Sequence, residues 1–244
     1  MLRRIPGAAA MPTPPDQAKL VAMNESTLTA MRQEMVEMIA AYASMVGDRT
    51  GRQCIDERVL AAMAKVPRHE FVPLELRQFA YVDSPLPIGY DKTISQPFIV
   101  ALMTDLLDLK PDDTVLEIGT GLGYQAAVLS ELAGRVYSVE IIEELATEAR
   151  RRLKQLGYDK IEQRLGDGSQ GWVQHGPYGK ILVTAAPELI PPPLLNQLKP
   201  EGRMVLPAGI EDAQQLMLVE KDRSGRIKTT EILPVRFLPL VTSH

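Results

Sequence analysis

The stretch VLEIGTGLGY, residues 115–124, decides the fold. Its first part is an apolar, strand-like run that ends near Glu117. Gly119, Gly121 and Gly123 then crowd a turn, and a helical pattern follows. Glycine lets a backbone adopt positive φ and approach a ligand closely. The first strand-to-helix turn of a doubly wound α/β sheet is also where nucleotide-like ligands bind. The stretch therefore predicts a fold class and, at the same turn, a ligand site.

Strand-like and helix-like segments alternate around and after this turn, and three further strand-like segments close the chain. In chain order they are strand 114–119, helix 124–132, strand 135–141, helix 143–157, strand 161–165, strand 180–186, helix 191–199, and strands 202–209, 214–222 and 227–240. Alternation of this kind indicates a parallel sheet with helices on both faces. The last three strands have no helices between them. We predict an α/β fold with a doubly wound, mostly parallel sheet, N-terminal helices and an antiparallel C-terminal edge.

The chain before residue 114 carries helices and loops. Apolar residues at spacings of three and four predict a helix over 20–45, which Gly47 ends, and a second helix over 56–66. The segment 67–97 is rich in loop signals. Pro97 opens a further helix, because proline favours the first helical position.

Length and composition fit one globular domain. The chain has 244 residues, of which 45% are hydrophobic and 24% charged, so it can bury a sizeable core. We expect residues 1–19, which hold four prolines, to form a flexible tail. Residues 20–244 then form a single domain.

The charge and cysteine content exclude several classes of function. The net charge is −4, which gives no electrostatic reason to expect nucleic acid or an anionic membrane as a partner. No apolar run approaches the roughly 18 residues that a membrane span needs. Cys54 is the sole cysteine and there are three histidines, so the sequence predicts no disulfide and no metal centre. This cysteine usage favours a cytoplasmic protein.

Two carboxylates stand where a nucleoside site needs them. Glu140 ends the second strand and can accept hydrogen bonds from both ribose hydroxyls, as in other folds of this topology. Asp167, in the run GDG at 166–168, can accept from an adenine amine. The loop does not fit the dinucleotide fingerprint GxGxxG, because Tyr124 stands at its last glycine. Its spacing resembles the S-adenosylmethionine (AdoMet) loop of class I methyltransferases.

Ser95 lies just before the helix that Pro97 opens. The first N–H groups of a helix have no partners within it, so they can hold an anion or a carboxylate. The alternative is that Ser95 or Gln96 serves only as the helix cap.

Taken together, the motifs closely resemble protein-L-isoaspartate O-methyltransferase over about 52–241. They are PRHEFVP, LPIGYDKTISQPFIVALMTDLL, VLEIGTGLGYQAAVLSEL, GDGSQGW, ILVTAAP and VRFLPL, with TISQP and GDGxxGW the most specific. The resemblance implies the Rossmann-like class I methyltransferase fold, with region 20–97 binding substrate. It implies Ser95 as the catalytic residue and no metal. It implies AdoMet contacts from Thr93, Ile94, Glu117, Gly119, Gly121, Gly123, Glu140, Asp167 and Gly168.

The activity implied by the resemblance is protein repair. A methyl group moves from AdoMet to the free carboxylate of an L-isoaspartyl residue, and the ester collapses through a succinimide back toward aspartate. A carboxylate with a pKa near ~4 is ionised at neutral pH, so no strong base is needed. Ser95 would orient the acceptor, since a serine nucleophile needs an adjacent base. We expect a monomer with a peptide groove lined by the 67–97 loops, acting on isoaspartyl-containing proteins and peptides.

The sequence departs from the family pattern in places, and alternatives stay open. Tyr90 and Asp91 replace smaller or amide residues before the TIS motif, and Val241 replaces a hydroxyl found in some members. A methyltransferase for a small-molecule carboxylate is one alternative. A non-catalytic AdoMet-binding module is another. A nicotinamide oxidoreductase is the weakest, because GxGxxG is missing.

Overall fold

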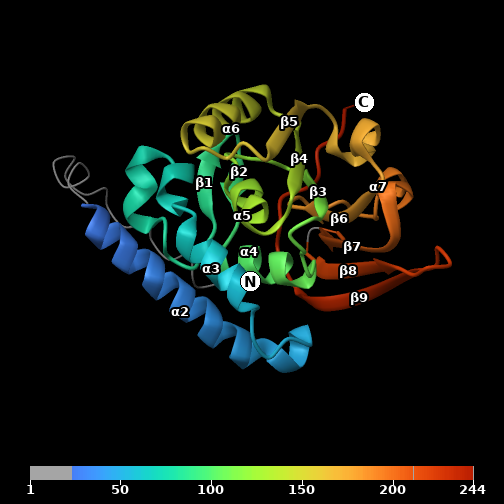
Figure 1. Cartoon of the computed structure of the whole chain (residues 1–244), viewed down its shortest axis with the longest axis horizontal. Helices are drawn as coiled ribbons and strands as arrows, with labels where there is room; N and C mark the ends of the chain where they lie inside the picture. The colour runs from blue at the N-terminus through green and yellow to red at the C-terminus, as the bar shows by residue number, and fades with distance from the viewer. Residues whose placement is uncertain (1–23, 211, 244) are drawn as a thin grey trace, which may run out of the picture.

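The computed structural model describes residues 24–210 and 212–243 (Figure 1). The expected tail, 1–19, lies outside the described residues. The α-helices are α2 (Glu25–Thr50), α3 (Glu57–Lys65), α4 (Pro97–Leu106), α5 (Tyr124–Leu132), α6 (Glu143–Gln155) and α7 (Pro192–Gln197). The strands are β1 (Leu86–Gly89), β2 (Lys92–Ile94), β3 (Thr114–Ile118), β4 (Arg135–Glu140), β5 (Ile161–Leu165), β6 (Tyr178–Val183), β7 (Leu198–Ala208), β8 (Gln215–Lys221) and β9 (Ile227–Pro234).

The central sheet has the order β5-β4-β3-β6-β7-β8-β9. Strands β3 to β7 pair in parallel, and β8 and β9 are added antiparallel to one edge. This confirms the predicted fold class. The strand order changes direction between β3 and β6, and open α/β sheets bind ligands outside the carboxyl ends of the strands at such a point. The topology therefore places the ligand site where the glycine-rich turn follows β3.

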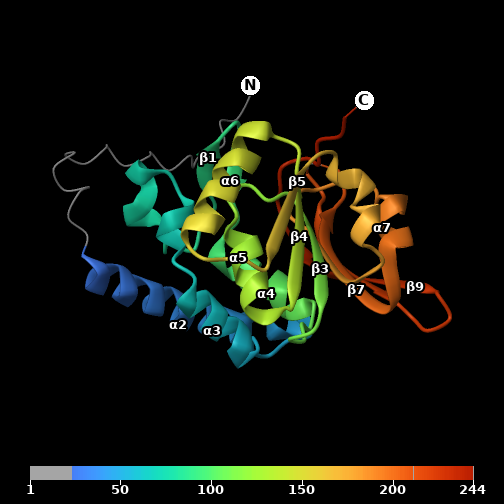
Figure 2. The same cartoon turned by 45° about the horizontal axis from the view of Figure 1, so that its top comes forward.

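Helices cover both faces of the sheet. Figure 2 shows α4, α5 and α6 on one side and α7 on the other, with α2 running along the outside of the first layer. Each side has its own apolar core, which explains why the central strands read as unbroken apolar runs. Within the described part of the chain, no helix is long and apolar enough to cross a membrane.

The predicted end of the first helix was wrong. Helix α2 continues through Gly47 to Thr50, and it is Gly51 that takes the left-handed conformation (φ 68°) and donates its N–H to the Gly47 carbonyl at 2.9 Å. A glycine inside a helix costs only about 1 kcal/mol relative to alanine. Gly47 is buried, and an added Cβ would lie 2.6 Å from Oε1 at the end of the Gln53 side chain.

The segment 67–97, expected as loops, contains two 3₁₀ turns and the antiparallel hairpin β1–β2. Its two-residue turn is Tyr90–Asp91, and both residues have φ of 53°. Turns of this kind usually carry glycine or asparagine because φ is positive. The sequence pattern therefore gave no hairpin signal.

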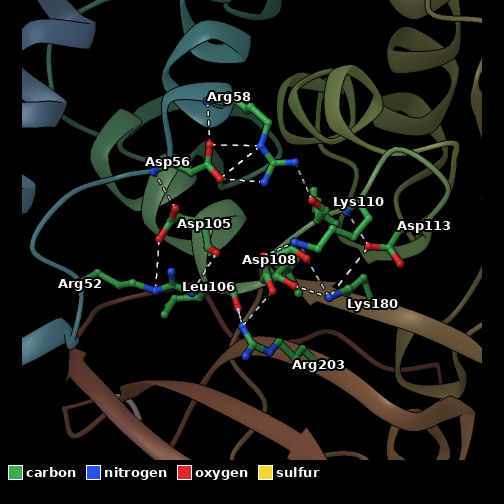
Figure 3. Close-up of polar contacts among 12 residues, drawn as sticks. Arg52, Asp56, Arg58, Asp105, Leu106, Asp108, Lys110, Asp113, Lys180 and Arg203 are labelled. Atoms are coloured by element: carbon green, nitrogen blue, oxygen red, sulfur yellow. Dashed lines mark hydrogen bonds and ion pairs between the residues drawn. The ribbon is translucent and has the colours of Figure 1, made fainter.

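The C-terminal end of α4 is held by basic side chains from other elements (Figure 3). The last carbonyls of a helix have no partners within it, and cations there complement the helix dipole. The donors are Arg52 to the Asp105 carbonyl (3.5 Å), Arg203 to Leu106 (3.3 Å), Lys180 to Leu107 (2.6 Å) and Asp108 (2.9 Å), and Arg58 to Leu109 (3.1 Å). These contacts fix α4 against the sheet, and with it the turn that precedes α4.

Candidate functional site

A cavity of about 710 Å³ opens at the carboxyl ends of β3, β4 and β6. A volume of this size suits a cofactor-sized ligand. Its walls come from the hairpin β1–β2 and the start of α4, the glycine-rich turn, the ends of β4 and β6, the chain after β9, and α2. The lining residues are Tyr42, Val46, Pro85, Ile88, Lys92, Thr93, Ser95, Gln96, Phe98, Ile99, Ile118, Gly119, Gly121, Val139, Glu140, Ile141, Leu145, Gly168, Thr184, Ala185 and 233–241.

The glycine-rich turn needs its glycines. Gly119, Gly121 and Gly123 have φ of 93°, 55° and 97°. A Cβ on Gly119 would lie 2.4 Å from Oγ1 of Thr184, whose hydroxyl donates to the Gly119 carbonyl at 2.7 Å. Gly119 and Gly121 line the cavity, whereas Gly123 caps α5 and packs against Leu153.

Glu140 ties the end of β4 to this turn. Its Oε2 accepts the Gly121 N–H at 2.8 Å, and its Oε1 accepts those of Ile141 and Ile142 at 2.9 and 3.0 Å. It is 6% exposed and lines the cavity. A carboxylate offers about four acceptor positions. Three of these positions already accept backbone N–H groups, two on Oε1 and one on Oε2. The expected contact with two ribose hydroxyls stays a prediction, and Oε2 is the oxygen with more acceptor capacity left for it.

Glu117 lies beneath the turn rather than in the cavity wall. It is completely buried, and its Oε2 accepts a short hydrogen bond from Ser138, whose hydroxyl also meets that of Thr120 at 2.5 Å. Its Oε1 has no hydrogen-bond partner among the described residues. Burial raises the pKa of Glu117 to about 8. The side chain supports the turn from below.

This buried carboxyl predicts a pH-dependent stability. Its pKa is about 8 in the folded protein against an ordinary 4.5. Between these values the unfolded chain has released a proton that the native state still binds, so the native state loses stability as pH rises. We expect the free energy of unfolding of the wild type to fall, relative to that of Glu117→Gln, from about pH 5 to about pH 8. Urea unfolding at several pH values, with Glu144→Gln as an exposed control, measures this, and parallel curves would contradict it.

Arg68 binds the backbone of Ser95. The Arg68 side chain is fully buried, donating from Nη2 to the Ser95 carbonyl at 2.7 Å and from Nε to the Ala80 carbonyl at 2.8 Å. Its guanidinium also lies 4.7 Å from the centre of the Tyr124 ring, at the start of α5. The arginine therefore links the turn before α4 to the helix that follows the glycine-rich turn.

A carboxylate from the chain itself occupies the N-terminus of α4. Asp83 accepts the Phe98 N–H at 2.8 Å and the Gln96 side-chain amide at 2.7 Å. Neither the Ser95 nor the Gln96 side chain caps the helix. The interpretation of Ser95 or Gln96 as the helix cap is therefore wrong, because Asp83, distant in sequence, accepts the Phe98 N–H. The expected binding of a carboxylate next to Ser95 stays a prediction, and Asp83 already takes one of the N–H groups at this helix end. The Ser95 hydroxyl lines the cavity and makes no hydrogen bond within the described residues.

Asp167 is held by its own neighbours. Its Oδ1 accepts the Ser169 N–H at 2.8 Å, and its Oδ2 accepts from Ser243 N–H (3.0 Å) and hydroxyl (3.2 Å). The adjacent Gly168 lines the cavity, and a Cβ there would lie 2.3 Å from Ile118. The expected contact of Asp167 with an adenine amine stays a prediction, and it requires Ser243 to share or leave Oδ2.

The structure thus brings most, but not all, of the predicted residues to one cavity. Thr93 and Ser95 line it, while Ile94 is buried in the hairpin. Within 67–97, only residues from Pro85 onward reach the cavity. The site residues predicted from the sequence did not include Thr184, the chain at 233–240 or the α2 wall, although Thr184 and 235–240 lie within the motifs ILVTAAP and VRFLPL. Long-range topology brings these segments to the cavity.

Comparison with known proteins places the chain in a family. The sequence model of the family protein-L-isoaspartate(D-aspartate) O-methyltransferase (PCMT) matches residues 43–244. The chain belongs to this family. Protein-L-isoaspartate O-methyltransferase 1 of Polaromonas sp. (strain JS666) is 60% identical over 215 residues, covering 88% of this chain and 91% of the relative.

Solved structures show the same fold. A protein-L-isoaspartate O-methyltransferase structure superposes with a TM-score of 0.73 at 28% identity, over 85% of this chain and 65% of that one. A structure from Plasmodium falciparum, described as a protein-L-isoaspartate O-methyltransferase in complex with S-adenosyl-L-homocysteine, gives a TM-score of 0.72 at 20% identity, over 87% of this chain and 99% of that one.

Proposed function

We propose that this chain transfers a methyl group from AdoMet to the free carboxylate of L-isoaspartyl residues in damaged proteins and peptides. The product ester then leads through a succinimide back toward aspartate. The observation that carries the proposal is that one cavity joins the glycine-rich turn with Glu140 to the Ser95 turn, in a chain of this family.

The residues present fit the cofactor. Gly119 and Gly121 leave room for close approach, Glu140 can accept from the ribose, and Gly168 keeps the adenine end open. Thr93 borders the same space. The contacts expected from Ile94, Glu117 and Gly123, which do not line the cavity, would be indirect, through the backbone they support. Once bound, AdoMet supplies an electrophilic methyl group.

The chain's own contribution is to place the acceptor. An isoaspartyl carboxylate is ionised at neutral pH, so no general base is required. The Ser95 hydroxyl can donate to that carboxylate, and Arg68 and Asp83 hold the turn that carries it. Correct placement of reacting groups can supply about 7–11 kcal/mol of a barrier.

Methyl transfer to paired peptides tests the function. The two peptides carry isoaspartate or aspartate at the same position, and AdoMet carries a labelled methyl group. We expect label only in the isoaspartyl peptide, and Ser95→Ala lowering kcat/KM by roughly 10- to 100-fold through one lost hydrogen bond to a charged group. Ser84→Ala, outside the cavity lining, is the control. Label in neither peptide, despite AdoMet binding, would refute the proposal.

We further propose that the protein acts as a monomer in the cytoplasm. Its single cysteine, Cys54, is exposed and free, which suits a reducing compartment. Sedimentation equilibrium measures the mass, and a stable dimer would overturn the monomer.

A further inference from the structure

The cavity continues past the Ser95 turn to a wall made by α2. Tyr42 and Val46 lie one helical turn apart and both line it. The centre of the Tyr42 ring lies 5.7 Å from that of Phe98, the second residue of α4, which follows Ser95. The α2 wall therefore adjoins the acceptor side of the cavity, and the glycine-rich turn lines another part of it.

Tyr42 is partly exposed, although neighbouring residues of α2 are buried. Ile39, one turn before Tyr42, and Ala43, the next residue, are buried, whereas Tyr42 keeps 43% of its surface accessible. Met45, on the same helix, is 79% exposed and lines no part of the cavity. An aromatic ring that is half covered by protein and half open to a cavity offers a surface for an apolar ligand group.

A second wall of the cavity is also apolar. Leu233, Val235 and Phe237, at and after the end of β9, line the cavity. Apolar side chains from two distant parts of the chain thus line the same cavity as Ser95. A flanking side chain of the acceptor peptide is the group that would enter such a space while the isoaspartyl carboxylate lies at Ser95.

We propose that Tyr42 and Val46 form a subsite for an apolar side chain next to the isoaspartyl residue. The proposal rests on the function proposed above and adds to it a preference for acceptor peptides with an apolar residue beside the isoaspartyl residue. These two residues would select acceptor peptides by the side chain next to the isoaspartyl residue. The proposed cofactor contacts involve other residues.

Kinetics with four variants test the subsite. The substrates are isoaspartyl peptides that carry leucine or serine immediately before or after the isoaspartyl residue. We expect kcat/KM of the wild type to be higher for a leucine peptide than for the matching serine peptide. Tyr42→Ala should lower this ratio roughly tenfold, the scale of a lost apolar contact. Val46→Ala should reduce it in part. Tyr42→Phe should keep it, and Met45→Ala, the matched control on the same helix, should leave it unchanged.

The AdoMet KM and the melting temperature separate a subsite from a general defect. Both should stay at wild-type values in Tyr42→Ala. Equal losses for leucine and serine peptides, or no loss at all, would overturn the subsite while leaving the methyltransferase activity standing. If the wild type methylated no isoaspartyl peptide, the proposed function itself would fail.

Discussion

Replacing Glu140 with alanine is expected to weaken AdoMet binding about a hundredfold, or roughly 3 kcal/mol. The substitution removes the acceptor that we propose for a ribose hydroxyl. It also frees the Gly121 N–H that the Glu140 carboxylate holds at 2.8 Å, so the glycine-rich turn loses its anchor to β4. Each hydrogen bond to a charged group contributes about 1.5–3 kcal/mol. Isothermal titration with AdoMet measures the affinity.

A neighbouring carboxylate gives the matched control for this experiment. Glu144 is exposed in the first turn of α6, so Glu144→Ala removes the same charge nearby without touching the turn. Its AdoMet affinity should stay within a factor of about two of the wild type, as for most surface substitutions. A Glu140→Ala protein that binds AdoMet as tightly as the Glu144→Ala protein would show that Glu140 makes no ligand contact.

Local patterns explain why so much of the fold could be predicted. The glycine-rich turn and α5 follow from adjacent residues: apolar strand, glycines, then helical spacing. The predicted bounds 124–132 and 161–165 agree with α5 and β5. Such signals act over a few residues, and nothing distant competes with them.

The site was harder to predict because its supports are distant in sequence. Asp83 caps a helix whose first residue is Pro97, whereas sequence reasoning looks for a cap next to the helix. Glu117 stands at the end of a strand, which suggested a ligand contact, but its side chain points to Ser138 beneath the turn. Topology decides which side a strand-terminal residue faces, and a single motif does not carry that information.

Arg68→Met is expected to lower kcat for isoaspartyl methylation about a hundredfold while changing the AdoMet affinity only a few-fold. The side chain donates to the Ser95 carbonyl at 2.7 Å, and losing that bond frees the turn that carries the Ser95 hydroxyl. A misplacement of about 1 Å at a reacting centre can cost about a hundredfold in rate. Arg68 donates to the Ala80 and Ser95 carbonyls and not to Glu140 or Gly119–Gly123, where we propose that the cofactor binds.

The readout that decides this prediction is the split between kcat and AdoMet affinity, measured together with thermal unfolding. Arg68→Lys keeps the charge and an N–H donor group but not the planar fork, so it should recover part of the rate. Arg77→Met is the control, because Arg77 pairs with Glu70 at the surface of the same segment. If rate, affinity and melting temperature fell together in Arg68→Met, the arginine would be a general structural residue.

The cost of burying the Arg68 guanidinium indicates that this residue serves to position the Ser95 turn. Removing a cation from water costs several kcal/mol, and among the described residues no carboxylate pairs with it. Methionine fills a similar space without that cost, so hydrophobic packing alone would favour the substitution. Two carbonyls on separate turns, those of Ala80 and Ser95, both take their hydrogen bonds from this one planar group. A rigid fork with donors in fixed directions sets the distance between the two turns, which neither methionine nor a single ammonium group can do.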